Sequence, residues 1–318
     1  MAEHDAPWLI GMDVGGTNLR VGIVHQNRVV WEQRVQADFA TFCRQSPPGE
    51  ALEFIIDTIA GAMQEARARY QHVSAIGIGF PGFIDPALNV VSQSPNLPGL
   101  RNIDLANPLA KVLGLPVVVE NDALVAAYGE YISGAHPQNT IYIGLGTGVG
   151  GGAVLNGRAF PGSHGVAMEV GHIIIEPGGR LCGCGNRGCL EQYASASGVS
   201  LSYAELSGMK GIDSAVIAAS AREGEPHALA AYQRAGDALA QGLATILKVL
   251  DVSRVIVGGG MSLSWPLMKS AFDARLDADL IPALRGEKVE IFLSESGDQA
   301  GIIGAAMLAH ALQVKRQA

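Results

Sequence analysis

Three of the four cysteines lie within eight residues, in the pattern C-x-C-x4-C formed by Cys182, Cys184 and Cys189. His172 lies ten residues before the first of them. One imidazole and three thiolates supply the four ligands that a closed tetrahedral zinc site requires. Glycines between the cysteines let the backbone turn tightly enough for three sulfurs to converge on one ion. The pattern therefore predicts a structural zinc site.

Two other interpretations of the cysteine run stay open, a small group of buried free thiols and a disulfide. A disulfide within C-x-C would be badly strained, and neither interpretation accounts for the interleaved glycines. The ligand number and ligand types favour zinc. Cys43 lies far from this run in the sequence and is expected to be an ordinary thiol.

A glycine-rich turn is expected near the start of the chain. The apolar run 8–12 is followed by DVGGTN at 13–18 and by a second β-rich run at 20–24, which predicts a hairpin. Gly15 and Gly16 would bring backbone N–H groups close to a ligand, and Thr17 adds a hydroxyl, as in a phosphate-binding loop. A plain β-turn is the alternative for this motif taken alone.

A second glycine-rich turn follows the predicted strand 140–145. The stretch GLGTGVGGG at 144–152 contains six glycines and one threonine. Two hairpins with glycine-rich turns, one in each half of the chain, indicate an internal duplication. The Walker pattern G-x-x-x-x-G-K-[ST] is absent from the sequence, which disfavours a P-loop nucleotidase.

Further polar or glycine-rich segments follow other predicted strands, at the ends where open α/β sheets bind ligands. The strand 73–79 leads into GFPG at 79–82, the strand 116–120 precedes Asn121 and Asp122, and the strand 254–257 opens into three glycines. These glycines would admit a flat ring, although a tight strand-to-helix turn explains them nearly as well. Helical spacing of apolar residues predicts helices over 51–69 and 232–250, and the uncharged stretch 300–312 predicts a last one.

Length and composition limit the function classes. The 318 residues suggest two domains, and 48% hydrophobic content indicates a folded protein. The net charge of -8 argues against nucleic acid as the main partner. The N-terminal residues lack the features of a secretion signal, and no apolar run reaches the length of a membrane span. With thiols grouped for metal, these features lead us to expect a cytoplasmic protein with no membrane partner.

These motifs together resemble those of the ROK family of sugar kinases and repressors. DVGGTN at 13–18 resembles the family's first phosphate loop, GLGTGVGGG at 144–152 its second, and GGG at 258–260 its adenosine motif. EVGH at 169–172 followed by CGCGNRGCLE at 182–191 resembles its sugar and zinc signature, the most specific of the set. The resemblance covers about residues 8–310.

The resemblance implies an α/β, actin-like and hexokinase-like fold of the ribonuclease-H type, with two domains and a cleft between them. A small domain would span 1–118, completed by a C-terminal helix at about 300–318, and a large domain 119–299 would carry the zinc loop. The implied activity is ATP-dependent phosphorylation, with Mg²⁺, of the 6-hydroxyl of glucose or a related hexose. A homodimer is also expected.

The resemblance also implies roles for individual residues. Asp122 would be the general base, and zinc would be bound by the His172 and cysteine set described above. Five residues would hold sugar hydroxyls: Asn96, Asn121, Glu169, His172 and Glu191. The ATP-binding set, in which Asp13 lies near magnesium and the phosphates, would comprise Asp13, Gly15, Gly16, Thr17, Asn18, Gly146, Thr147, Gly148, Gly258, Gly259 and Gly260. Transfer of a phosphoryl group to an alcohol needs such a carboxylate base, a magnesium ion and the exclusion of water.

The chain departs from the family pattern near the expected sugar. Met168 stands where family sugar kinases usually have glycine, and Leu124 where they often have asparagine; His164 and Gly165 resemble allose kinases. Met168 is expected to narrow the space around the sugar. Allose, fructose, N-acetylmannosamine and N-acetylglucosamine therefore stay open as substrates, and so does polyphosphate as the phosphate donor. A sugar-responsive ROK transcriptional regulator is disfavoured, because it needs a helix-turn-helix ahead of the first phosphate loop.

Overall fold

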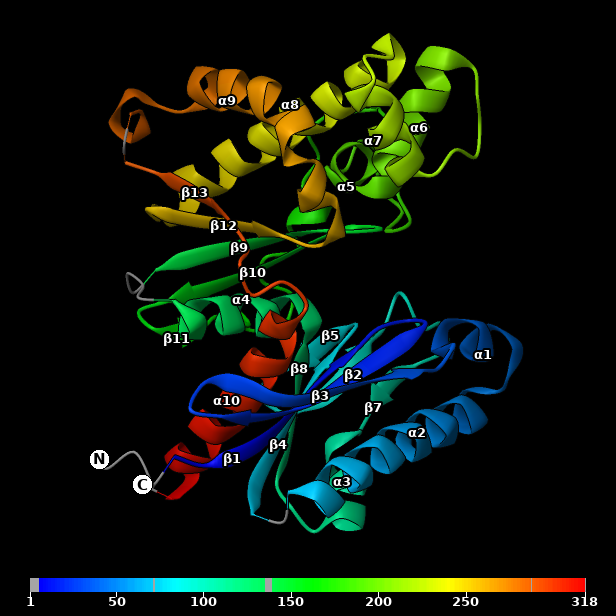
Figure 1. Cartoon of the computed structure of the whole chain (residues 1–318), viewed down its shortest axis with the longest axis vertical. Coiled ribbons are helices and arrows are strands. Elements are labelled where there is room, and N and C mark those ends of the chain that lie inside the picture. Colours follow the sequence, from blue (N-terminus) through cyan, green and yellow to red (C-terminus); the bar gives the residue numbers. More distant parts are fainter. Residues whose placement is uncertain (1–5, 71, 135–138, 287, 318) are drawn as a thin grey trace. The chain divides into compact units, whose positions relative to one another are not determined.

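The computed structural model describes residues 6–70, 72–134, 139–286 and 288–317, and the chain forms two compact units (Figure 1). The first unit comprises Met1–Gln138, Gly152–Ala167 and Ser296–Ala318, and the second comprises Asn139–Gly151 and Met168–Glu295. The domain boundary expected between residues 118 and 119 stays a prediction, and residues 119–134 lie with the first unit.

The first unit is built on a five-stranded mixed sheet in the order β3-β2-β1-β4-β8. Its first three strands form an antiparallel meander, and β4 and β8 continue the sheet in parallel to β1. The hairpin predicted around DVGGTN is confirmed. The strand bounds are β1 (Trp8–Val14), β2 (Asn18–His25), β3 (Arg28–Gln36), β4 (Val73–Phe80) and β8 (Val117–Asn121).

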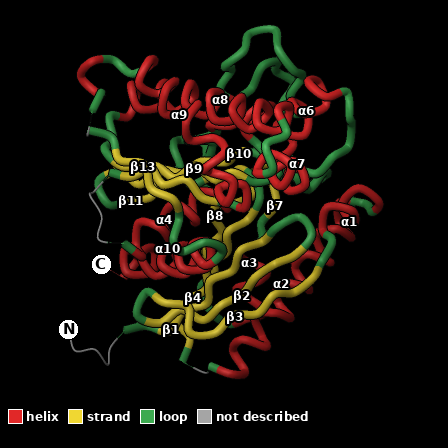
Figure 2. The backbone as a smooth tube through the Cα atoms, turned by 45° about the horizontal axis from the view of Figure 1, so that its top comes forward, coloured by secondary structure: helices red, strands yellow, loops and turns green. Residues whose placement is uncertain are grey.

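Helices cover both faces of this sheet (Figures 1 and 2). The side chains of Ile10, Met12 and Ile78 lie in one large buried cluster, which includes residues of α2 and α3. Leu9 of β1 and Ala75 of β4 lie on the opposite face of the sheet and pack against α10. The helix bounds are α1 (Phe39–Gln45), α2 (Pro48–Arg69), α3 (Ala106–Leu113), α4 (Asp122–Ser133) and α10 (Gln299–Gln317).

Helix α10 approaches its neighbours at glycine positions. A Cβ atom added to Gly11 of β1 would lie 1.9 Å from the carbonyl oxygen of Ile302, and one added to Gly77 of β4 would lie 1.8 Å from that of Ala305. On α4, a Cβ atom at Gly129 would lie 1.8 Å from the carbonyl oxygen of Ala300. Since any side chain would collide with the helix backbone, these glycines set how closely α10 packs.

A small antiparallel sheet follows β4. It consists of β5 (Phe83–Asp85), β6 (Val90–Gln93) and β7 (Arg101–Ile103). The short segment 79–82 connects it to the end of β4, so it stands at the carboxyl ends of the parallel strands of the first sheet. The sequence patterns did not predict these strands, which are three or four residues long.

The second mixed sheet has the order β11-β10-β9-β12-β13, which repeats the arrangement of the first sheet. Its β11 pairs antiparallel with β10, while β12 pairs in parallel with both β9 and β13. The repeat confirms the internal duplication predicted from the two glycine-rich turns. The strand bounds are β9 (Thr140–Leu145), β10 (Val149–Leu155), β11 (Arg158–Ala159), β12 (Arg254–Gly258) and β13 (Glu290–Leu293).

The helices of the second unit follow a long loop between 160 and 190. Helices α8 and α9 lie side by side (Figures 1 and 2), and a Cβ atom at Gly236 of α8 would lie 2.4 Å from the carbonyl oxygen of Met268 in α9. The bounds are α5 (Glu191–Ala194), α6 (Ala196–Ser207), α7 (Ser214–Arg222), α8 (Pro226–Leu250) and α9 (Trp265–Asp279), with short 3-10 helices at Val170–His172, Gly260–Ser264 and Pro282–Leu284. Among the described residues, no helix has both the length and the apolar character needed to cross a bilayer.

Candidate functional site

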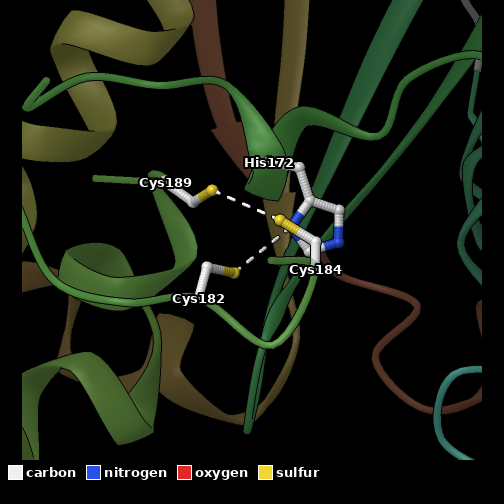
Figure 3. A group of neighbouring side chains, drawn as sticks. All are labelled: His172, Cys182, Cys184 and Cys189. Atoms are coloured by element: carbon white, nitrogen blue, oxygen red, sulfur yellow. Dashed lines mark hydrogen bonds between the residues drawn. The ribbon is translucent and has the colours of Figure 1, made fainter. Parts of the chain in front are cut away.

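His172 and the three neighbouring cysteines converge in the second unit, as the sequence predicts (Figure 3). One ligand atom from each residue lies within 4.8 Å of all the others. The Nδ1 atom of His172 lies 3.7 Å from Sγ of Cys182, and the sulfurs of Cys184 and Cys189 are 3.6 Å apart. The four donors therefore surround one point.

These separations fit a tetrahedral zinc ion. Sulfurs bound at about 2.3 Å in a tetrahedron lie roughly 3.7 Å from one another, and the 3.6 Å between the sulfurs of Cys184 and Cys189 is close to this value. Burial and the neighbouring thiols raise the pKa of Cys189 to about 12 in the absence of metal. Metal binding must displace that proton, since zinc binds the thiolate. The donor set is closed, because it offers four protein ligands to an ion that prefers four.

The loop that carries the cysteines is fixed by its own backbone and by Arg180. Cys182 and Asn186 join through a backbone hydrogen bond of 2.9 Å, and Gly188, at φ 81°, lies where a Cβ atom would collide with the carbonyl oxygen of Glu176. The guanidinium of Arg180 donates from Nε and Nη2 to both carboxylate oxygens of Glu205 in α6, at 2.8 and 2.7 Å. Such a bidentate pair holds the loop against the helix with defined geometry.

Glu169 lies beside the metal cluster. Its Oε2 is 3.8 Å from Nε2 of His172, so the two ring nitrogens of that histidine face different partners, a thiol and a carboxylate. That separation is too long for a hydrogen bond, so the carboxylate faces the ring without being bonded to it. Burial raises the pKa of Glu169, His172 opposes that rise, and Glu191 adds to it. The structure thus brings these three predicted sugar-binding residues into one neighbourhood.

Glu191, the first residue of α5, braces the second glycine-rich turn. Its Oε2 accepts a hydrogen bond of 3.1 Å from the backbone N–H of Val149. A Cβ atom at Gly148 would lie 2.3 Å from the same oxygen, so a larger residue there would have to displace the carboxylate from its bond to Val149. The turn carbonyls are also engaged, that of Gly146 by the N–H of Ala196 and that of Thr147 by the hydroxyl of Ser197.

The three glycines that begin at the last residue of β12 approach the same turn at Gly259. A Cβ atom at Gly259, whose φ is 81°, would lie 2.3 Å from the carbonyl oxygen of Leu145 at the end of β9. A Cβ atom added at Gly146 or at Gly260 would have no atom within 4 Å, so the space beside the backbone is open at both glycines. The structure therefore brings the expected second phosphate loop and adenosine motif together.

The first glycine-rich turn has a similar frame in the first unit. Gly15 donates to the carbonyl oxygen of Asn18 at 2.8 Å and closes the turn. The carbonyl of Gly16 accepts from the N–H of Ala40, in the first turn of α1, and that of Thr17 accepts from the N–H of Ala37, just before the helix. The Thr17 side chain is exposed, and the amide of Asn18 donates to its hydroxyl at 3.3 Å.

A row of charged residues crosses the first sheet below this turn. Asp13 pairs in register with Arg20 on one side and with Gly79 on the other, and Gly79 pairs with Glu120. Arg20 also forms an ion pair of 2.7 Å with Asp298. Burial raises the pKa of Asp13 to about 6 and that of Glu120 to about 7. The sequence patterns singled out Asp13 but missed the other charged residues, whose only signal is a charge within an apolar strand.

Asp122 begins α4 directly after β8. Asn121 is the N-cap, because its side-chain oxygen accepts from the N–H of Leu124 at 3.0 Å, and its amide donates to the carbonyl of Gly82 at 3.0 Å. Aspartate is a favoured N-cap residue, but Asp122 is not the cap of this helix. Asp122 accepts from the N–H of Ala123 at 2.8 Å and occupies the first helical position, at the carboxyl end of a parallel strand.

Asn96 lies in an exposed turn between β6 and β7. This turn is tied to the segment 79–82, since Ser94 donates to the carbonyl of Pro81 and a Cβ atom at Gly82 would lie 2.7 Å from the carbonyl oxygen of Gln93. The amide of Asn121 reaches the same segment. Asn96, Asn121, Asp122 and the first turn thus belong to the first unit, while the remaining predicted site residues belong to the second.

A family model described as the ROK family matches residues 9–312 of the chain. The chain belongs to the ROK family. It is 34% identical to a glucokinase of Streptomyces coelicolor, over 94% of this chain and 96% of that protein. It is 30% identical to an N-acetyl-D-glucosamine kinase of Shigella boydii, over 94% of this chain and 98% of that protein.

The solved structures of ROK proteins confirm the fold class. A ROK family glucokinase from Streptomyces griseus, in complex with glucose and AMPPNP, superposes with a TM-score of 0.79. It is 33% identical, and the match covers 96% of this chain and 99% of that one. The two mixed sheets of the ROK chain described above are therefore those of the actin-like, hexokinase-like fold predicted from its motifs.

Proposed function

We propose that this ROK protein is an ATP-dependent kinase that phosphorylates the 6-hydroxyl of glucose or a closely related hexose. The observation that carries the proposal is the position of Asp122. It begins α4 at the carboxyl end of β8, where α/β sheets bind ligands, and a separate residue, Asn121, serves as the helix cap. The Asp122 carboxylate is therefore not needed to cap α4. The relatives that phosphorylate glucose and N-acetyl-D-glucosamine support a sugar kinase.

Asp122 accepts the proton of the sugar hydroxyl as that oxygen attacks the terminal phosphate of ATP. A positioned base of this kind accelerates a reaction by about 10²–10⁴-fold. Asn96, Asn121, Glu169, His172 and Glu191 accept and donate hydrogen bonds to the other hydroxyls and fix the orientation of the sugar. His172 has its Nε2 side free of the thiols, so it can contact the sugar and the metal with different nitrogens.

The two glycine-rich turns bind the phosphates of ATP, and Gly258, Gly259 and Gly260 admit its adenosine. The open backbone at Gly146 and Gly260 supports this assignment. Asp13 and the phosphates would hold Mg²⁺, which neutralises charge that develops on the transferred group. His172, Cys182, Cys184 and Cys189 would hold zinc, which stabilises the loop that carries Glu191 and takes no part in the chemistry.

The variant Asp122→Asn tests the base assignment. Asparagine keeps the size and polarity of the side chain but cannot take the proton, so kcat should fall about 10²–10⁴-fold while the hexose KM stays within a few-fold. The measurement is ATP-coupled ADP release with glucose, mannose, allose, fructose, N-acetylglucosamine and N-acetylmannosamine.

Asp213→Asn is the matched control, because it makes the same chemical change at the start of another helix. Asp213 caps α7 by accepting a hydrogen bond from the N–H of Ala215. The kcat of Asp213→Asn should equal that of the unaltered enzyme. Near-native kcat in Asp122→Asn would remove Asp122 as the base. An absence of turnover with every sugar in the unaltered protein would remove the kinase proposal itself.

A further inference from the structure

Arg180 lies two residues before Cys182, and its guanidinium reaches the two helices that follow the cysteines. The Arg180 side chain is 12% exposed. A guanidinium has five N–H donors, and Arg180 makes five hydrogen bonds. The acceptors are the carboxylate of Glu205, from Nε and Nη2, the hydroxyl of Ser202, from Nη2, and the backbone carbonyls of Gln192 and Gly198, from Nη1. Each donor of this largely buried cation therefore has a partner.

Two of these acceptors belong to the junction of α5 and α6, residues 191–198, where one residue separates the helices. In a continuous helix, the N–H of Ala196 would donate to the carbonyl of Gln192, four residues earlier. It donates instead to the carbonyl of Gly146 in the second glycine-rich turn, at 2.9 Å. The Gln192 carbonyl accepts from Arg180. The interruption of the helix thus provides one donor for the turn and one acceptor for Arg180.

The α5–α6 junction contacts the second turn at two further points. The hydroxyl of Ser197 donates to the carbonyl of Thr147 at 2.9 Å. The carboxylate of Glu191 accepts from the N–H of Val149 at 3.1 Å. The position of the junction backbone therefore determines where the second turn is held.

The junction has little room to adjust. A Cβ atom at Gly198 would lie 2.7 Å from the carbonyl carbon of Tyr193 and 2.8 Å from that of Gln192. The buried hydroxyl of Ser195 donates to the carbonyl of Glu191 at 2.7 Å and accepts from the N–H of Gly198 at 2.9 Å. Because the segment is packed this closely, a displacement of the Gln192 carbonyl would shift the groups after it that contact the turn.

We propose that Arg180 is a positioning residue for the second glycine-rich turn and, through that turn, for the phosphates of ATP. Arg180 satisfies the carbonyl of Gln192, so the N–H of Ala196 stays with Gly146. Without the guanidinium, this partly buried carbonyl would compete with Gly146 for the same N–H, since leaving it unpaired is unfavourable. The inference rests on the proposed function, in which this turn binds the phosphates.

Arg234 allows this role to be separated from the ion pair with Glu205. Its Nη1 also donates to Glu205, at 2.8 Å, and its guanidinium lies 5.0 Å from the centre of the Tyr193 ring, compared with 4.6 Å for Arg180. Its Nη2 donates to the carboxylate of Glu176 at 3.3 Å. Arg234→Lys is therefore the matched control, because it perturbs the same acid and the same ring and leaves the bonds from Arg180 to the junction carbonyls.

Arg180→Lys keeps the positive charge but replaces the planar fork with one ammonium group, which cannot serve Glu205 and both junction carbonyls together. We expect the ATP KM to rise about tenfold, the size of one lost hydrogen bond to the turn. The hexose KM should stay within about twofold, because Glu191 lies two residues after Cys189, which the metal holds. Arg234→Lys should keep both values within about twofold. The measurement is steady-state kinetics on zinc-loaded protein.

An unchanged ATP KM in Arg180→Lys overturns the proposal. An equal rise in Arg180→Lys and Arg234→Lys also overturns it, because the ion pair with Glu205 would then be responsible. If Arg180→Lys does not fold, Ser197→Ala provides the test, since Ser197 is exposed and its hydroxyl joins the junction to the turn. Its ATP KM should rise about threefold, and an unchanged value overturns the positioning of the turn by the junction.

Hydrogen exchange tests the inference without any turnover. A peptide containing residues 144–152 should exchange several-fold faster in Arg180→Lys than in Arg234→Lys, because the turn loses one of its bonds to the junction and opens more often. Exchange at 13–18, in the first turn, should be the same in both variants. Equal exchange of 144–152 in the two variants overturns the positioning role. This measurement stays valid if no hexose is phosphorylated, so a failure of the proposed function and a failure of the inference give different results.

Discussion

The two glycine-rich turns have the same plan and differ in what holds them. In each turn, the carbonyls of one glycine and one threonine accept hydrogen bonds at the start of a helix, α1 for the first turn and α6 for the second. The second turn has an additional brace, the Glu191 carboxylate, which accepts from Val149 and fills the space beside Gly148. The first turn has no such side chain against Gly16, where a Cβ atom would make an ordinary contact of 3.5 Å with Ala40.

The charges of the two turns differ as well. Asp13 ends the apolar part of β1 and pairs with Gly79, whereas the residue at the corresponding place in β9 is Gly144, which pairs with Gly258. The first turn therefore has an acid on its own strand, and the second receives its acid from the segment that follows the cysteines. The two copies of the sheet thus differ in the origin of the acidic residue near the turn: Asp13 lies on β1 itself, whereas Glu191 follows the cysteine loop.

Removal of the metal should produce the largest difference between the turns. Cys184→Ala should lower zinc from about one ion per chain to near zero and release the loop that positions Glu191. Because even indirect changes around a metal cost about 10–100-fold in affinity or activity, kcat/KM should fall by at least roughly 100-fold. Elemental analysis reports the metal, and hydrogen exchange compares peptides at 13–18 and 144–152.

In Cys184→Ala, the rate of hydrogen exchange should rise in the second glycine-rich turn and stay unchanged in the first. Cys43→Ala is the matched control, since Cys43 is a buried thiol outside the cluster, and it should keep its zinc. Fresh protein that contains no zinc would contradict the metal assignment, and equal changes in both peptides would contradict the brace.

A methyl group added at one glycine of each turn should destabilise the protein more in the second turn than in the first. This effect should be smaller than that of removing the metal. Gly148→Ala puts a Cβ atom 2.3 Å from the Glu191 carboxylate, which must then move and leave the N–H of the buried Val149 without its partner. This should lower the free energy of unfolding by about 1–3 kcal/mol, the usual cost of an unsatisfied buried donor. Gly16→Ala makes only a 3.5 Å contact and should change it by less than about 0.5 kcal/mol. Urea denaturation measures both. Similar losses in the two variants would show that the brace does not constrain the second turn.

Asp13, the acidic residue beside the first turn, should give the smallest effect, which is a change in the free energy of unfolding with pH. Burial raises the pKa of Asp13 to about 6, so the folded state holds its proton where the unfolded state has already lost it. The free energy of unfolding should therefore fall as pH rises from about 4 to 6 and then level off. The size should be on the order of 1 kcal/mol after screening by solvent.

Asp13→Asn should abolish this fall, which is measured as the difference between the variant and the unaltered protein in denaturation series from pH 4 to 7.5 without magnesium. Burial also raises the pKa of Glu120, to about 7, so a second and separate fall should persist in Asp13→Asn and disappear in Glu120→Gln. Identical pH profiles in all three proteins would contradict both shifts.

The sequence predicted most of the framework because the framework depends on local patterns. Apolar runs that end in glycines predicted β1, β9 and β12. Helical spacing predicted α2 except for its first three residues and α8 except for its first six. The sequence did not predict β5, β6 or β7, since strands of three or four residues carry too short an alternation. Helices α1, α6, α7 and α9 were also missed, because they are short or have weak apolar stripes.

The candidate site was predictable where ligand type alone is informative. Four zinc-type ligands at close spacing predicted the cluster of His172 and the cysteines, and the structure confirms that they converge. The brace from Glu191 to Val149 joins residues 42 apart in the chain, and no local pattern reports such a contact. The left-handed backbone of Met168 and the capping role of Asn121 were missed for another reason, since the sign of φ and the choice between two adjacent caps depend on the surrounding backbone.

The glycine positions under α10 determine when the first unit can be completed during synthesis. Gly11 of β1, Gly77 of β4 and Gly129 of α4 each lie against the backbone of the helix at 299–317. The second unit needs residues no later than 295, whereas the first needs segments from both ends of the chain. The first half of the protein therefore leaves the ribosome early yet closes last, with an uncovered sheet face and long sequence separations that slow folding.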